Sequence, residues 1–371
     1  MLAFLLSLGV FVLLLSFLVF IHELGHFAVA KWCGMRVDEF AIGFPPRIWS
    51  KKRGETTYAL NAIPFGGYVK IHGENPDADG EEGDEDPGSF DRKPVRSRIA
   101  VILAGIAMNT LFAFVALTVA FSAGFTSISQ DLASRSDATV IRQEVLVSSV
   151  GVGSPADKAG IKPGDVVLGL TPFGEESKKV ANINELVSFT KELQARNNLS
   201  LEVKYDRSGT NGVSVVTLNP TGPAMGVSIQ SLDTVRVPVL QAPGVAIHEM
   251  GAILGLTWDA LAGFGKKLVR AELDENVSGP IGIYQATATA TKMGFSQVLF
   301  LAIVLSLNLA LLNLLPIPAL DGGKFVFLIV EGVFRKRGVH RKLERAMTSI
   351  SFIVLIGLMI ILTGRDIFRL F

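Results

Sequence analysis

Met1 to Ile21 form an almost unbroken apolar run, and this run constrains the fold of the chain more than any other feature of its sequence. As an α-helix at ~1.5 Å per residue, the run is about 31 Å long, which is enough to cross the hydrocarbon core of a bilayer. A secretory signal peptide is the alternative, but no basic segment stands in front of the run and no small-residue cleavage site stands at its end. The sequence therefore predicts a membrane-spanning helix.

Three more apolar stretches bring the expected number of membrane spans to four. They cover about Ile99–Phe125, Val298–Val333 and Met347–Leu362. The third stretch is interrupted by two prolines and two glycines, namely Pro316, Pro318, Gly322 and Gly323. Because proline cannot continue a regular helix, this span must break or bend in or near the membrane, where the freed backbone groups need new partners.

The composition supports a membrane protein and narrows its chemistry. Of 371 residues, 49% are hydrophobic and only 19% are charged, and the mean hydropathy is +0.43, which is too apolar for an ordinary soluble enzyme. The net charge of +1 gives no electrostatic footprint for nucleic acid. Cys33 is the one cysteine, which excludes an internal disulfide and any cysteine-rich metal site. A metal ion would have to be held by His, Asp or Glu.

Lysines and arginines gather in two loops beside the predicted spans. The loop between spans one and two contains Lys31, Arg36, Arg47, Lys51, Lys52, Arg53, Lys70, Arg92, Lys93, Arg96 and Arg98. The loop after span three contains Arg335, Lys336, Arg337, Arg341, Lys342 and Arg345. By the positive-inside rule both loops are cytoplasmic. The N-terminus, the C-terminus and the segment from about 126 to 295 are then expected on the far side, periplasmic or extracellular, of a cytoplasmic (inner) membrane.

The far-side segment has the pattern of a soluble α+β domain, which we place at residues 126–225. Its four strand-like runs are Val145–Val152, Asp165–Leu168, Leu199–Tyr205 and Val213–Leu218. Turn residues separate these runs, and one helix is expected at about Ile183–Ala195. The domain would lie between an N-terminal membrane half, residues 1–125, and a linker, residues 226–295, with the C-terminal membrane half at 296–371.

Two segments outside these elements have open interpretations. Met250–Leu273, in the linker, suits an amphipathic helix in a membrane interface, and a connecting helix packed on the soluble domain fits equally well. Pro76–Pro87 is rich in Asp and Glu, which favours a solvated loop. A calcium loop is the alternative there, but the segment does not meet the EF-hand pattern.

The pattern His22-Glu23-Leu24-Gly25-His26 carries the clearest chemical signal in the chain. On a helix, residues four apart lie on one face, so both imidazoles can reach a single Zn²⁺ at about 2.0–2.1 Å, with Glu23 beside them as a general base. These groups continue a predicted membrane helix, where ionisable side chains are costly and usually mark a function. The alternative is a pair of histidines hydrogen-bonded at a helix end, with Glu23 in solvent.

A zinc site needs a third protein ligand while one position stays open. His72, His248 and His340 are candidates, but each lies in a loop or polar segment outside the spans. Asp321 is the better candidate, because it stands in the third apolar stretch beside glycines that permit a turn and a close backbone approach. A turn-capping aspartate at the membrane edge is the alternative.

Together, the HExxH motif and the stretch Asn313-Leu-Leu-Pro-Ile-Pro-Ala-Leu-Asp-Gly-Gly323 resemble the site-2 protease family, and within it the bacterial regulator-of-sigma-E type. The resemblance implies one zinc ion per chain, ligated by His22, His26 and Asp321, with Glu23 activating water. It also implies that Asn313 handles substrate near the metal. An interhelical hydrogen bond is the structural alternative for this asparagine.

Two further segments resemble parts of the same family. Gly151–Val167 resembles a PDZ segment, which implies a single PDZ domain whose groove takes an extended peptide. Phe40–Ile71 resembles the family's membrane-reentrant β-hairpin, whose edge pairs with unwound substrate, so Gly43 and Gly67, together with Pro316, are expected to handle substrate. Pro45 stands where glycine is more usual, and its missing N–H removes one ladder bond. A peripheral amphipathic hairpin is the alternative. The segment Ser278–Gly282 also matches a family segment before the third span.

The expected molecule is a multi-pass α-helical membrane protein with about four transmembrane helices, the third of them broken, a membrane-associated β-hairpin and one inserted α+β PDZ domain. The resemblance implies an intramembrane zinc metalloprotease that cuts transmembrane segments of single-pass proteins, such as a pre-trimmed anti-sigma factor or signal-peptide remnants. Its expected partners are these substrates, the lipid bilayer and a peptide at the PDZ domain. A metal transporter and a non-catalytic PDZ scaffold are the alternatives. Spans two and four lack central ionisable residues, which disfavours a transporter, and a scaffold would not need Glu23.

Overall fold

The computed structural model describes residues 2–74, 86–129, 132, 138–180, 182–207, 209–270, 279–334 and 341–368. The chain divides into two compact units, each of which is described by itself. The first, called the membrane unit, comprises Met1–Ala116, Ile253–Thr291 and Gln297–Phe371. The second, called the sheet unit, comprises Leu117–Ala252 and Lys292–Ser296. Most of the acidic segment Pro76–Pro87, Ser278, His340 and the basic residues Arg335 to Arg337 lie outside the described residues.

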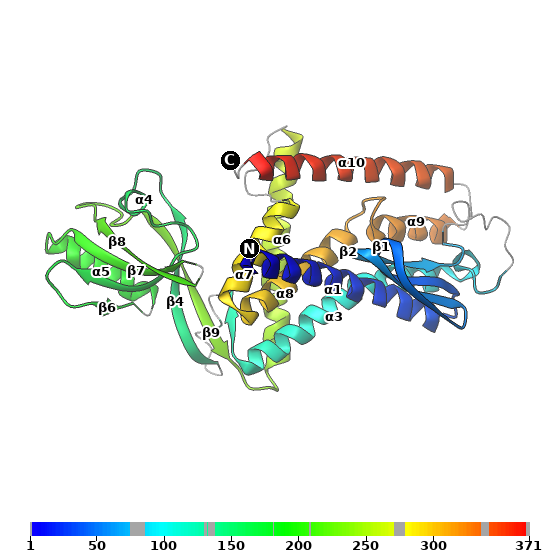
Figure 1. Ribbon diagram of the computed structural model, residues 1–371, viewed down its shortest axis with the longest axis horizontal. Coiled ribbons are helices and arrows are strands. Elements are labelled where there is room, and N and C mark those ends of the chain that lie inside the picture. The colour runs from blue at the N-terminus through cyan, green and yellow to red at the C-terminus, as the bar shows by residue number, and fades with distance from the viewer. Residues whose placement is uncertain are drawn as a thin grey trace. The chain divides into compact units, whose positions relative to one another are not determined.

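Four helices among the described residues are long and apolar enough to cross a membrane, which confirms the number of spans expected from the sequence. They are α1 (Leu2–Trp32), α3 (Val95–Ala123), α8 (Phe295–Leu314) and α10 (Arg341–Phe368) (Figure 1). Their spanning windows are largely exposed, because the apolar side chains that would face lipid have no protein to pack against. The last turns of α3, from Leu117 on, belong to the sheet unit.

The third apolar stretch is broken as predicted. Helix α8 ends at Leu314 and α9 (Asp321–Phe334) begins after a link of six residues, so that Asp321 stands at the N-terminus of α9. The link folds tightly, with the N–H of Leu320 donating to the carbonyl of Ile317 at 2.8 Å. A Cβ on Gly322 would lie 2.2 Å from the carbonyl oxygen of Leu315, and one on Gly323 would lie 2.3 Å from that of Ile317. Only glycine therefore allows the link to lie against the first turn of α9.

One face of α9 carries four side chains with distinct partners: Asp321, Lys324, Leu328 and Glu331. This spacing places them along one stripe of a helix. Leu328 is buried in a core with residues of α1, α3 and both strands of the hairpin described below. Arg98 of α3 donates to Glu331, with one Nη1 to Oε2 contact of 3.0 Å. Helix α9 is thus fixed against α3 along its length.

A long β-hairpin forms from β1 (Val37–Arg53) and β2 (Thr56–Ile71), which confirms the hairpin expected at Phe40–Ile71. Residues 39–42 pair antiparallel with residues 67–70 on one edge. On their other edge they lie against residues 57–60, and there the residue numbers of both segments increase in the same direction. The register breaks between the pairs Phe44–Ile63 and Arg47–Asn61. Pro45 thus lies at an irregularity of the ladder, where its missing N–H costs no regular hydrogen bond.

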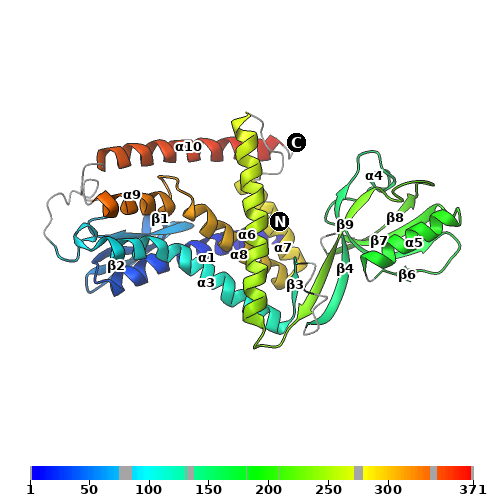
Figure 2. The same ribbon diagram turned by 180° about the vertical axis from the view of Figure 1, so that it is seen from behind.

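The sheet unit contains a seven-stranded sheet in the order β3-β9-β4-β5-β7-β8, with β6 paired to β5. The strands are β3 (Phe125–Ser127), β4 (Thr139–Val150), β5 (Val166–Pro172), β6 (Lys178–Lys179), β7 (Ser200–Arg207), β8 (Thr210–Thr217) and β9 (Val227–Arg236). A short helix α4 (Pro155–Lys158) and helix α5 (Ile183–Ala195) accompany them. Figure 2 shows α5 beside the part of the sheet that contains β7. Leu186 and Leu193 of α5 are buried against Leu170, Leu201 and Val203 of the strands.

The sheet unit contains a strand beyond residue 225, the boundary that the sequence suggested for the expected soluble domain. Strand β9 pairs with β4 from Val227–Val150 to Arg236–Thr139, so it is part of the sheet rather than of a linker. The run was missed because its pattern of small and polar residues, Val227-Ser-Ile-Gln-Ser-Leu-Asp-Thr-Val-Arg236, lacks the apolar density of the other strands. A cut at 225 would separate two paired strands.

Two helices follow the sheet, α6 (Ala242–Val269) and α7 (Pro280–Met293). Helix α6 covers most of Met250–Leu273, the stretch that the sequence left open between an interfacial helix and a connecting helix. Its residues up to Ala252 belong to the sheet unit and those from Ile253 to the membrane unit. In the membrane unit, Thr257 Oγ1 donates to Asn308 Oδ1 of α8 at 2.7 Å. The contact joins α6 to α8 within the membrane unit, and both interpretations of the stretch stay predictions.

Candidate metal centre

Helix α1 presents two buried histidines one turn apart. His22 is 7% exposed and His26 is 8% exposed, and both belong to the apolar span that begins at Ala3. Their Nε2 atoms lie 3.2 Å apart. Because the residues are four apart on a helix, their side chains share one face and point to the same place.

Asp321 completes a group of three possible metal ligands. Its Oδ2 lies 3.1 Å from Nε2 of His22 and 3.4 Å from Nε2 of His26, and its side chain is 16% exposed. Among the described residues, these three side chains form the cluster that could hold a metal ion. The carboxylate comes from α9, which the broken link after α8 turns toward α1.

The spacing of these three atoms fits zinc. A tetrahedral Zn²⁺ with ligands at about 2.0–2.1 Å separates its ligand atoms by about 3.3–3.4 Å. The three observed separations of 3.1, 3.2 and 3.4 Å are close to this edge length. Two imidazoles and one carboxylate are also a donor set that zinc takes in catalytic sites, where the fourth position stays open.

The backbone of α3 orients His26. Its Nδ1 donates to the carbonyl oxygen of Val101 at 2.8 Å. A proton on Nδ1 leaves the lone pair of Nε2 free, and this is the nitrogen that faces His22 and Asp321. The hydrogen bond therefore selects the tautomer that a metal ligand needs.

Asn109 of α3 lies against the other histidine. It is fully buried, and its amide nitrogen is 3.3 Å from Nδ1 of His22, while its Oδ1 has no hydrogen-bond partner. Rotating the amide by 180° exchanges its two atoms and places Oδ1 against Nδ1. The oxygen would then accept a hydrogen bond from the Nδ1–H of His22, which frees Nε2 of His22 for a metal in the same way as in His26.

Two glycines let α1 and α3 approach closely enough for these contacts. A Cβ on Gly105 would lie 2.5 Å from Nε2 of His26 and 2.7 Å from Nε2 of His22. A Cβ on Gly25 would lie 2.3 Å from the carbonyl oxygen of Ala104. Both imidazoles therefore lie against the backbone of α3 at Gly105, in space that a side chain at that position would fill.

We expect Asn109→Leu to lower zinc affinity about 10- to 100-fold, as the loss of a hydrogen bond to a ligating histidine usually does. Asn109→Asp keeps an oxygen acceptor and should bind zinc within a few-fold of the native chain. Competition with a zinc-binding dye on the purified proteins measures both affinities. Thr110→Val is the control, because the hydroxyl of the neighbouring Thr110 donates to a carbonyl of its own helix, that of Ile106, at 2.8 Å. Equal affinities for Asn109→Leu and the native chain would contradict the role of Asn109.

Glu23 lies beside this cluster without joining it. It follows His22 in α1 and is half-buried. Its carboxylate is within electrostatic range of His22, His26 and Asp321. A base next to two possible zinc ligands, but turned away from them around the helix, suits a group that accepts a proton from water.

Residues 10–358 match the family model described as Peptidase family M50, whose members are the site-2 proteases. This chain belongs to peptidase family M50. A relative from Nostoc sp. is 31% identical over 360 residues, which cover 95% of this chain and 93% of the relative. A relative from Clostridium perfringens is 32% identical over 356 residues, which cover 95% of this chain and 96% of the relative. One from Fusobacterium nucleatum is 31% identical over 361 residues, which cover 97% of this chain and 98% of the relative. All three carry the name "Putative zinc metalloprotease".

Within this M50 chain, the other histidines considered as ligands have different surroundings. His72 is buried, and its Nδ1 is 3.1 Å from Oδ2 of Asp38. His248 is an exposed residue of α6. His340 lies outside the described residues. Of the three alternatives to Asp321, neither of the two described ones is a member of the cluster with His22 and His26.

The residues expected to handle substrate occupy two segments of the membrane unit. Asn313 is half-buried in the last turn of α8, and Pro316 is in the link to α9. In the hairpin, Gly67 pairs with Ile42, the neighbour of Gly43, so the two glycines lie near each other. Gly43 has a φ of +81°, which an L side chain rarely adopts.

Three M50 residues near the cluster were missed in the sequence: Gly105, Asn109 and Lys324. Gly105 and Asn109 are four apart in the second apolar stretch, so they share a helix face. A polar residue inside an apolar span usually has a partner within the bundle, and this is the signal that could have identified Asn109. Lys324 follows the glycines after Asp321 in the third stretch and could have been noticed as a charge in an apolar run.

Proposed function

We propose that this M50 chain is an intramembrane zinc metalloprotease that hydrolyses peptide bonds within or near transmembrane segments of single-pass membrane proteins. The observation that carries the proposal is the meeting of His22, His26 and Asp321 next to Glu23, on helices of an apolar bundle. Relatives that are 31–32% identical and named for zinc metalloprotease activity support the choice of metal and reaction.

In the proposed mechanism, His22, His26 and Asp321 hold one zinc ion. When bound, zinc supplies Lewis acidity, which polarises a carbonyl and makes water more acidic. Glu23 accepts the proton of the attacking water and later gives a proton to the leaving amine. Val101 and Asn109 hold the two imidazoles in their required tautomers.

The hairpin is proposed to receive the substrate as an extended strand. A transmembrane helix hides its amides in its own hydrogen bonds, so the segment must unwind before cleavage. Residues 67–70 pair with β1 on one edge, and among the described residues no strand pairs with their other edge. That edge offers backbone partners to an unwound segment. Gly43, Gly67, Asn313 and Pro316 would help to place it.

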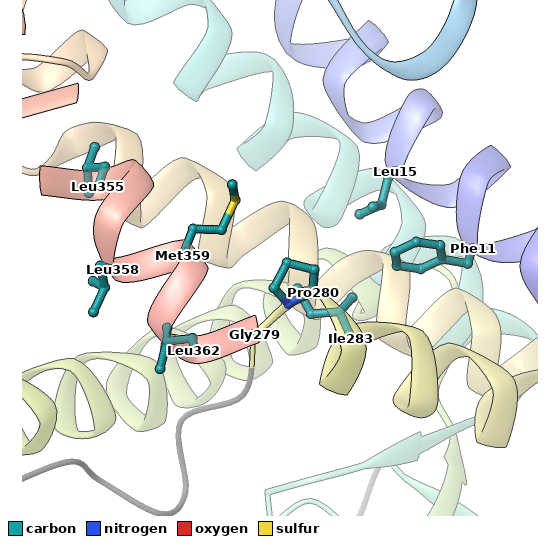
Figure 3. Close-up of a pocket in the computed structure, with 9 residues that line it drawn as sticks. All are labelled: Phe11, Leu15, Gly279, Pro280, Ile283, Leu355, Leu358, Met359 and Leu362. Carbon is teal, nitrogen blue, oxygen red and sulfur yellow. The ribbon is translucent and has the colours of Figure 1, made fainter. Parts of the chain in front are cut away.

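An apolar cavity in the membrane unit supports the proposal that the substrate is an apolar segment. It measures about 330 Å³ and lies between α1, the start of α7 and α10. Figure 3 shows Phe11 and Leu15 of α1 on one side and Leu355, Leu358, Met359 and Leu362 of α10 on the other. Leu15 precedes His22 by about two turns of the same helix. The space beside α1 is therefore open to apolar chains.

We infer that the sheet unit acts as the single PDZ domain of the protease and binds an extended peptide or substrate segment by strand addition. Its strand and helix order, with α5 packed on the sheet, supports this assignment. Whether the domain recruits substrates or excludes those with large far-side portions is testable by deletion. Because β9 pairs with β4, such a deletion must extend to Arg236.

The proposed orientation places the sheet unit on the periplasmic or extracellular side of the cytoplasmic (inner) membrane, with the basic loops inside. In a Cys33→Ser background, Asn211→Cys should react with a membrane-impermeant thiol reagent in intact cells, and Arg92→Cys should react only after permeabilisation. Both side chains are exposed, so access to the reagent and not burial decides the labelling. The reverse pattern would invert the orientation.

The function is tested by cleavage of a tagged single-pass reporter by the purified protein in a bilayer. Candidate reporters are a pre-trimmed anti-sigma factor and a signal-peptide remnant. A non-catalytic PDZ scaffold would bind no zinc and cut nothing, and a metal transporter would bind metal without cutting. Zinc-dependent cleavage that a chelator stops would exclude both alternatives.

A further inference from the structure

Lys324 and Glu74 form an ion pair that the proposed mechanism does not use. The Nζ of Lys324 donates to Oε1 of Glu74 at 2.6 Å. The Glu74 side chain is only 15% exposed, whereas that of Lys324 is 37% exposed. A carboxylate so shielded depends on its cation, because a buried charge that loses its partner is strongly unfavourable.

This ion pair borders the candidate metal centre. Lys324 follows Asp321 by three residues in α9, so the two side chains share a helix face. The Lys324 ammonium is within electrostatic range of the carboxylates of Asp321 and Glu23, and Glu74 is within range of Glu23. Neither member of the pair belongs to the three possible ligands.

Glu74 is also fixed to the end of the hairpin. Its N–H donates to the carbonyl oxygen of Ile71, the last residue of β2, at 3.1 Å. The N–H of His72 donates to the carbonyl oxygen of Arg36 at 3.0 Å, which closes the base of the hairpin beside Val37. The Glu74 side chain therefore joins the end of β2 to the helix that carries Asp321.

On the basis of the proposed function, we propose that the Glu74–Lys324 ion pair fixes the position of residues 67–70 relative to the metal centre. The ion pair thereby determines which peptide bond of the substrate is cut. A strand added to that edge advances about 3.3 Å per residue. A slip by one residue would bring a different peptide bond to Glu23 and would turn the side chains to the other face. Glu74 and Lys324 are thus positioning residues rather than catalytic ones.

The first test maps the bonds cut in a transmembrane reporter by mass spectrometry. Lys324→Met and Glu74→Gln should retain zinc, but the fraction of product from the main cut should fall at least 3-fold as neighbouring bonds are cut. The double variant Glu74→Lys with Lys324→Glu, which exchanges the two charges, should restore the native cut pattern. Lys324→Arg, which retains the positive charge, should keep that pattern. Glu331→Gln is the matched control, because it weakens an ion pair that α9 makes with Arg98 of α3 about two turns along the helix from Lys324.

The second test does not depend on activity. In the inactive Glu23→Gln background, hydrogen exchange of backbone amides 66–74 should rise about 10-fold in Lys324→Met and stay unchanged in Glu331→Gln. An unchanged cut pattern in Lys324→Met, or equal exchange with and without the lysine, would overturn the proposal. If the native chain cut no reporter, the proposed function would be wrong, and the exchange experiment would still decide whether the ion pair holds the hairpin.

Discussion

Glu23→Gln is expected to lower the rate of peptide cleavage about 10³-fold while leaving the zinc content unchanged. A glutamine amide cannot accept a proton from water at neutral pH, and general-base catalysis contributes typically about 10²- to 10⁴-fold to a rate. Zinc is retained because Glu23 is offset by about 100° around α1 from His22 and is not among the three clustered donors. Cleavage of the transmembrane reporter and metal analysis of the purified variant measure the two effects.

The control for this variant is Glu55→Gln, which neutralises an exposed carboxylate in the turn between β1 and β2. It should change neither the rate nor the zinc content. Near-native cleavage by Glu23→Gln would show that another group accepts the proton. Loss of zinc from Glu23→Gln would instead show that Glu23 is a ligand, so the two measurements together separate the roles.

Asp321→Ala should lose both zinc and activity. The substitution leaves two imidazoles, and a catalytic zinc site ordinarily needs three protein ligands. We expect zinc occupancy below about a tenth of the native value and a rate at least about 10³-fold lower, since without the metal its Lewis acidity is also lost. Asp321→Asn, which is nearly equal in volume, tests whether the charge of the carboxylate is required.

Three histidine variants serve as controls for the loss of zinc: His72→Ala, His248→Ala and His340→Ala. Each should keep full zinc occupancy, although His72→Ala removes the contact with Asp38 and is expected to lower stability. Full zinc occupancy in Asp321→Ala, or its loss in one of the three controls, would mean that the third ligand was assigned wrongly.

The sequence determined the features that depend on local pattern. Apolar length predicted the four spanning helices, because a bilayer demands about 20 apolar residues from each. The two prolines of the third stretch predicted the break before Asp321, since proline removes a helix hydrogen bond. The helix at Ile183–Ala195 was expected among the turn residues of the far-side segment, and the hairpin at Phe40–Ile71 was implied by the resemblance to the site-2 proteases.

Which distant residues meet depends on how the whole chain packs. Asp321 and His22 are 299 residues apart, and no local pattern sets the distance between their side chains. The same holds for Asn109 against His22, for Glu74 against Lys324 and for β9 beside β4. A polar residue in an apolar run must find a partner, but packing of the helices chooses which one. The sequence thus specified the chemical groups of this site, and the close approach of α1 and α3 at Gly25 and Gly105, with the link folded against α9 at Gly322, assembled them.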